Sequence, residues 1–141
     1  MEFAALITWF AAILAGLYML AVWLIEKDEA TPSRLPAPVI VTHVALAAAG
    51  FAVWVAYLVM HRKTLAWAAA CCSPSRRSAL TMFLRWIPVY RGPDQPADTS
   101  QGAAHEIPAE GHFPVILVGC HGLLAVTTLI LVLLTALGVA G

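Results

Sequence analysis

The segment Ala37–Met60 reads APVIVTHVALAAAGFAVWVAYLVM and contains no Asp, Glu, Lys or Arg. Two further segments share this property, Phe3–Ile25 and Phe113–Gly138. Each exceeds the roughly 20 residues that an α-helix needs to cross about 30 Å of hydrocarbon. The sequence therefore predicts an all-α integral membrane protein with three transmembrane helices, over residues 3–25, 37–60 and 113–138.

The composition places the whole chain in one membrane domain, residues 1–141. Of its 141 residues, 61% are hydrophobic and 11% are charged, which lies outside the range of soluble globular proteins. The parts between the spans are too short to form a second folded domain. Because the formal net charge is zero, no overall field attracts nucleic acid, and none is expected as a partner.

Charge asymmetry predicts the orientation in the membrane. The connection 61–112 begins with bases and no acid among them: Arg62, Lys63, Arg76, Arg77, Arg85 and Arg91. Bases near the ends of spans favour the cytoplasmic side. Three crossings then place the N-terminus and the loop 61–112 in the cytoplasm and the C-terminus outside. The Ala-, Val- and Leu-rich composition is typical of the plasma (inner) membrane of a GC-rich bacterium.

The loop 61–112 divides into two parts. Residues 78–91 read SALTMFLRWIPVYR, which predicts a short amphipathic helix lying in the headgroup plane. Residues 92–111 are rich in Gly, Pro, Ala and Asp and predict a flexible strap, because they cannot bury enough apolar surface to fold. Basic and aromatic side chains are expected to anchor the chain at the phospholipid interface: Arg62, Lys63, Trp67, Arg85, Trp86 and Arg91.

Small residues on the spans predict helix packing. In lipid, close backbone approach over small side chains is a main source of packing energy. The expected packing positions fall at helical spacing on each span: Ala12 and Gly16; Thr42, Ala45, Ala49, Ala52 and Ala56; Ala125 and Thr128. The second span has another candidate face at His43, Ala47, Gly50 and Tyr57. A span with two such faces indicates a neighbouring helix from another chain.

His43 and His121 are the two histidines inside predicted spans, and ionisable residues there are candidates for function. A haem b site requires two imidazoles that face each other at one depth. Three crossings make the third span antiparallel to the second, so the two residues are expected to lie roughly 15 Å apart along the membrane normal. We therefore expect no single haem between them within one chain. Each could ligate a haem with a partner's histidine or bind a quinone carbonyl, and a structural histidine bonded to a neighbouring helix is the other interpretation.

Signatures of catalysis and of metal binding are absent from the sequence. It contains no nucleotide-binding loop, nucleophile elbow or zinc-protease helix. Cys120 and His121 are adjacent and therefore point in different directions on a helix, so no metal site is expected. We expect neither enzymatic activity nor a cofactor of the chain's own, with haem b or a quinone at His43 or His121 as the alternative.

These observations favour a non-catalytic accessory subunit of a larger membrane complex. The expected host is a bacterial respiratory or other energy-transducing assembly, joined by transmembrane helix packing as a hetero-oligomer with other integral membrane subunits. The first alternative is a haem b- or quinone-associated membrane anchor subunit that uses His43 or His121. The second is a homo-oligomeric channel or carrier, in which a polar ring is built from several copies.

Overall fold

The computed structural model describes residues 1–27, 33, 35–71, 74–90 and 109–139. These form α1 (Glu2–Glu26), α2 (Ala37–Met60), α3 (Lys63–Cys71), α4 (Pro74–Tyr90), the 3-10 helix η1 (Ala109–His112) and α5 (Val115–Ala136). The helices α1, α2 and α5 are long and apolar enough to cross a membrane. The predicted all-α fold is therefore confirmed, and the chain is a multi-pass membrane protein.

Local sequence explains where the helices begin and end. Pro36 and Pro114 precede α2 and α5 in extended conformations, because proline fixes φ and lacks the N–H that a helix interior needs. At the other end of α2, His61 adopts a left-handed conformation with φ of 50°, and its N–H bonds the carbonyl of Tyr57 at 2.7 Å. This residue ends α2 and turns the chain directly back into α3.

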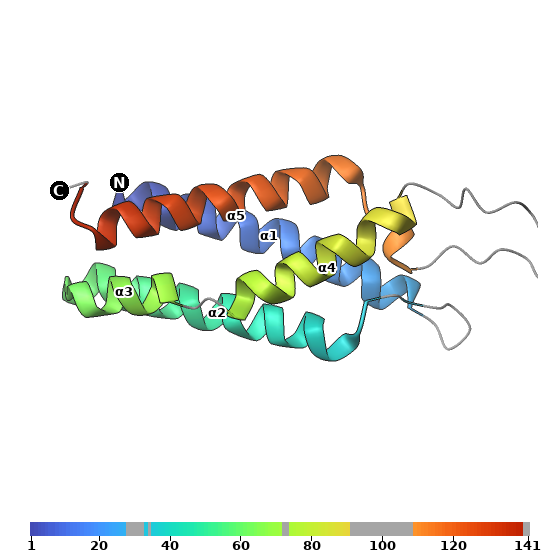
Figure 1. Ribbon diagram of the computed structural model, residues 1–141, viewed down its shortest axis with the longest axis horizontal. Coiled ribbons are helices and arrows are strands. Elements are labelled where there is room, and N and C mark those ends of the chain that lie inside the picture. Colours follow the sequence, from blue (N-terminus) through green and yellow to red (C-terminus); the bar gives the residue numbers. More distant parts are fainter. Residues whose placement is uncertain (28–32, 34, 72–73, 91–108, 140–141) are drawn as a thin grey trace, which may run out of the picture.

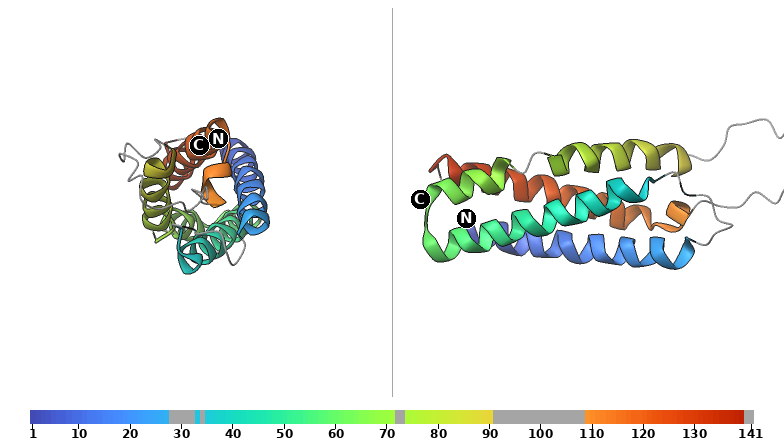
Figure 2. Two further views of the ribbon diagram at one scale, coloured as in Figure 1. Left: turned by 90° about the vertical axis from the view of Figure 1, so that its right-hand side faces the viewer. Right: turned by 90° about the horizontal axis from the view of Figure 1, so that it is seen from below.

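The helices form an elongated bundle in which α3 and α4 together occupy one position (Figure 1). Viewed from its end, the order around the bundle is α1, α2, α3 with α4, then α5 (Figure 2). α1 packs along α5, α2 packs against both α3 and α4, and α3 packs against α5. Because α3 and α4 carry the chain back along α2, α5 runs in the same direction as α2.

The segment 78–91 does not lie where the sequence predicted it, in the plane of the headgroups. Its predicted helix is confirmed as part of α4, but α4 lies lengthwise against α2 instead of across the end of the bundle. Trp86, expected at the interface, is buried with 7% of its surface exposed. The anchors Arg62, Lys63, Trp67 and Arg85 are exposed. Arg91 and the greater part of the predicted strap, residues 92–108, lie outside the described residues.

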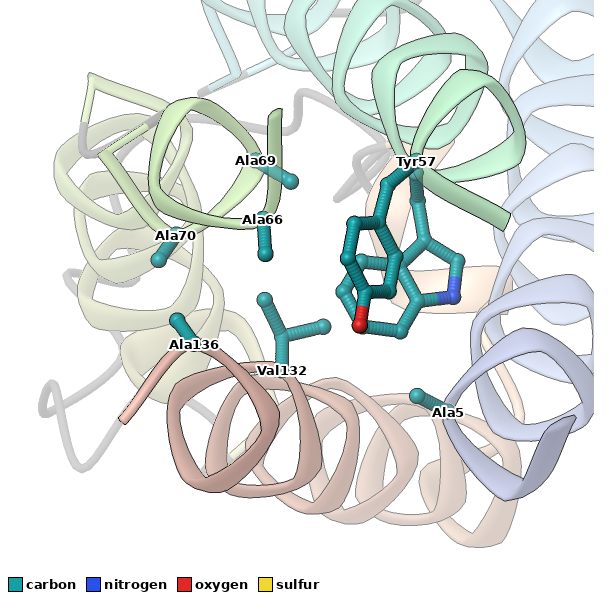
Figure 3. Packing of buried hydrophobic residues seen from close by; sticks show 8 residues of the cluster. Ala5, Tyr57, Ala66, Ala69, Ala70, Val132 and Ala136 are labelled. Carbon is teal, nitrogen blue, oxygen red and sulfur yellow. The ribbon is translucent and has the colours of Figure 1, made fainter. Parts of the chain in front are cut away.

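Two apolar clusters close the two ends of the bundle. The cluster at the termini combines Ala5 of α1, Trp54 and Tyr57 of α2, three alanines of α3, and Val132 and Ala136 of α5. Figure 3 shows Tyr57 directed toward Val132 and Ala5, with the small residues of α3 facing α5. The opposite cluster contains Trp23, Leu35, Ile40 and Ala109. The contacts of His121 with Ala12 and of Thr128 with Thr8 lie in the part of the bundle between these clusters.

The fold predicts that both termini lie on one side of the membrane, in contrast to the opposite sides expected from three crossings. Ala5 and Ala136 share one buried cluster, so the first turns of α1 lie beside the last turn of α5. Epitope tags at each end, probed by protease in sealed vesicles of known orientation, should be digested or protected together. Digestion of one tag with protection of the other would contradict this arrangement.

Candidate functional site

His43 of α2 and His121 of α5 lie next to each other inside the bundle. Their ring centres are 6.4 Å apart, and the ring planes are inclined at 70°. Each residue lies in the second turn of its helix. Because α2 and α5 run in the same direction, equal positions along the helices give equal depths. The expected separation of roughly 15 Å along the helix direction is therefore wrong, since it assumed that α5 is antiparallel to α2.

A hydrogen bond to α1 holds the ring of His121. Its Nδ1 lies 2.9 Å from the carbonyl oxygen of Ala12 and donates to it. One turn further along α1, Gly16 leaves room for the same ring, because a Cβ there would lie 3.1 Å from His121 Cε1. With its hydrogen on Nδ1, the neutral ring keeps the lone pair of Nε2 for a ligand. The predicted packing positions Ala12 and Gly16 thus form the support of His121.

The ring of His43 is supported from the opposite side of the bundle. Its Nδ1 lies 3.4 Å from the hydroxyl oxygen of Ser78 on α4. Ser78 was not among the residues selected from the sequence. The signal that identifies it is the four-residue spacing of Ser78, Met82 and Trp86, which share the face of α4 that packs on the bundle. Both imidazoles are therefore held through Nδ1, each by a different helix.

Polar contacts continue along the α1–α5 interface. The hydroxyl of Thr128 lies 2.9 Å from that of Thr8, which in turn donates to the carbonyl of Ala4 at 2.9 Å. Thr128 is buried, whereas Ala125 on the same helix is exposed. The histidine pair and the two threonines occupy the level between the two apolar clusters.

The two candidate faces of α2 have different surroundings. Its inward face is the one with His43, Ala47, Gly50 and Tyr57, all buried or half-buried. The small-residue stripe points outward, with four exposed members and a half-buried one: Thr42, Ala45, Ala49, Ala52 and Ala56. Trp54 and Tyr57 explain why this face of α2 points inward. Their two large rings fill the bundle interior, where small residues would leave space.

The pair offers two nitrogen ligands to a single metal ion. Nitrogen–metal bonds of about 2.1 Å put the centres of two ligating imidazoles about 6 Å apart, close to the observed separation. Within the part of the chain that the structure describes, no group of three or more His, Cys, Asp or Glu side chains is placed to hold a metal. Cys120 is exposed and does not extend the pair. Any ion held here needs its other ligands from elsewhere.

Comparison of the chain with protein-family models, with characterised proteins and with solved structures finds no match.

The threonine contact predicts a measurable contribution to stability. Replacing Thr128 with Val keeps the shape of the side chain but removes its hydroxyl from Thr8. Polar contacts between helices in lipid average about 0.6 kcal/mol, and we expect a loss of that size in the free energy of unfolding. The measurement is reversible unfolding in mixed micelles. The lipid-facing variant Thr42→Val serves as the control, and an equal loss in both variants would contradict the assignment.

Proposed function

We propose that this chain binds haem b between α2 and α5, with His43 and His121 as axial ligands, and acts as an electron-carrying membrane subunit. The observation that carries this proposal is the juxtaposition of the two imidazoles at 6.4 Å, in the interior of an apolar helical bundle. Ionisable residues within a membrane span are rare and mark functional sites by default. Two of them at one depth on facing helices are the arrangement in which helical bundles hold cofactors.

The ligand set favours a tetrapyrrole over a bare metal ion. A zinc or copper site assembles three or four protein ligands, and two imidazoles alone do not meet this number. A porphyrin supplies the remaining nitrogen ligands itself, so that the protein needs to contribute the axial positions only. Beside His121, α1 presents Ala12 and Gly16, and a helix backbone therefore borders the pair where a larger side chain would obstruct it.

The chain's own residues would set the properties of the site. The carbonyl of Ala12 accepts from Nδ1 of His121, which fixes the ligating tautomer of that ring and raises the basicity of its Nε2. The hydroxyl of Ser78 contacts Nδ1 of His43 and orients the second ring. The buried clusters on either side would restrict access of water to a bound haem, and low solvent exposure is one of the factors that set its reduction potential. Haem, when bound, supplies reversible one-electron chemistry, and the protein supplies the ligands and their environment.

This proposal predicts a b-type absorption spectrum that depends on both histidines. Protein produced with an adequate haem supply should show a Soret band, and His43→Ala or His121→Ala should abolish or strongly shift it. Gly16→Val should weaken the band, because its Cβ meets the ring of His121. His61→Ala and His112→Ala, at exposed histidines, are the matched controls. No haem in the wild-type protein, or equal loss in the controls, would contradict the proposal.

A second candidate function is the accessory role in a larger membrane complex, which the exposed stripe on α2 favours. Thr42, Ala45, Ala49 and Ala52 face outward from the bundle, at the spacing that lets another helix approach closely. This role is compatible with a haem site in the same chain. The absence of catalysis by the chain itself stays a prediction, as does the third alternative of a homo-oligomeric channel or carrier.

The accessory role predicts loss of partners when the stripe is filled. Ala49→Leu adds bulk to the exposed face of α2, so that a neighbouring helix can no longer approach closely. Proteins that co-purify with the wild type in mild detergent should be lost from this variant and retained in Val126→Leu, at an exposed position of α5. Purification of the wild-type chain without any co-purifying protein would contradict the role.

A further inference from the structure

The face of α4 that points away from the bundle carries two arginines. Its exposed residues recur at helical spacing: Arg77, Leu80, Thr81, Leu84, Arg85 and Pro88. The opposite face contains Ser78, Met82 and Trp86 and packs on the bundle. Leu80 and Leu84 each expose 57% of their surface between the two arginines. We call this surface the outer face of α4, and it combines apolar side chains with positive charge.

Arg77 lies at the depth of the histidine pair. The next residue, Ser78, contacts His43, which lies in the second turn of α2, about 9 Å from the start of that helix. α4 runs opposite to α2, because Ser78 contacts His43 whereas Met82 packs on the cluster that contains Ile40. Arg77 is therefore deeper than Ser78 along a helix that is long and apolar enough to cross a membrane.

The lipid headgroups are poorly placed to neutralise Arg77. Helical side chains lean toward the N-terminus of their helix, and α4 begins in the middle of the bundle (Figure 1). Arg77 would have to turn against this direction to reach the membrane surface at which α2 begins. Arg85 lies about two turns closer to that surface, where a long basic side chain reaches the headgroups. A charge at the depth of Arg77 instead requires a partner within the membrane.

The described helices of this chain offer no carboxylate at that depth. α2, α3, α4 and α5 contain no Asp or Glu, and the acids of α1, Glu2 and Glu26, are its first and last residues. Glu26 lies 3.9 Å from His112, and Glu2 accepts a hydrogen bond from Tyr57. A second copy of the chain would present the same helices and supply no counter-ion either.

We propose that the outer face of α4 docks a transmembrane helix of another protein, which carries an Asp or Glu at the depth of Arg77. The carboxylate pairs with the guanidinium, while Leu80 and Leu84 pack against apolar side chains of the same helix. The occupant is a helix, because irregular backbone exposed to lipid leaves its polar groups unpaired. This inference rests on the accessory role proposed above and names the chemistry of the partner.

Photocrosslinking in native membranes tests this surface. The photoreactive amino acid benzoyl-phenylalanine replaces Leu80, which follows Arg77 by one helical turn on the same face. Irradiation should join it to a peptide from a transmembrane helix of another protein, and that helix should contain Asp or Glu. The same amino acid at Leu123, an exposed position of α5, reports the background.

Charge variants connect the adduct to Arg77. Arg77→Gln should reduce the yield of the adduct roughly tenfold, because it leaves the partner's carboxylate unpaired, whereas Arg77→Lys should retain most of it. Arg85→Gln is the matched control and should leave the yield nearly unchanged, since Arg85 lies closer to the membrane surface. Replacing the partner's acid with Arg should abolish the adduct, and Arg77→Glu should then restore it. Because Arg77 is exposed, these variants leave the bundle core intact.

An adduct to lipid alone, to this chain, or to a helix without Asp or Glu would overturn the docking surface. No adduct above the background, or an unchanged yield in Arg77→Gln, would do the same. If proteins still co-purify with the wild type and are lost from Ala49→Leu, the accessory role stands and this surface alone fails. Purification without any partner would contradict both.

Discussion

The packing of α3 and α4 back along α2 is the constraint on which the rest of the structure depends. Three alanines of α3 and Trp86 of α4 are buried in this contact and its surroundings. The return path brings the chain to the end of the bundle where α2 begins, and α5 therefore starts there too. Because α2 and α5 run in the same direction, His43 lies beside His121, and the end of α5 lies beside the start of α1.

The sequence predicts the long helices well because their signal is local. The second span agrees with α2 at both ends, and the other two differ from α1 and α5 by at most two residues at either end. The position of α3 and α4 along the bundle is harder to predict from the sequence. Lys63, Arg77 and Arg85 interrupt this segment, so it does not stand out as an uncharged run. Its inward face nevertheless repeats at helical spacing, with Ala66, Ala70, Ser78, Met82 and Trp86 buried or half-buried.

Some features of the candidate site can likewise be recognised from the local sequence, and others depend on segments that are distant in the chain. A histidine inside an apolar span is visible in the sequence, and so are the small residues Ala12 and Gly16 that approach it. The pairing of the histidines is not visible, because their relative depth depends on the direction of α5, which a distant segment determines. Arg77 likewise reads as a residue of a cytoplasmic loop, and only the contact between Ser78 and His43 places it at the depth of the spans.

Hydrogen-bonded side chains of α1, α2 and α5 lie between the two buried clusters of the bundle. Apolar clusters close both ends, and the hydrogen-bonded histidines and threonines lie between them. A polar group buried in a bundle stabilises it only if its hydrogen bonds are satisfied. Ala12 and Ser78 do this for the Nδ1 atoms, and the proposed axial ligation would do it for Nε2.

The most direct test of this account is the distance between positions 43 and 121. A variant with cysteine at both positions, and with Cys71, Cys72 and Cys120 replaced by Ser, would be treated with a bimane reagent that fluoresces when it bridges two neighbouring thiols. The account predicts strong fluorescence within single chains, absent from either single-cysteine control. No bridging between the two positions, with each thiol still reactive alone, would contradict the parallel arrangement of α2 and α5.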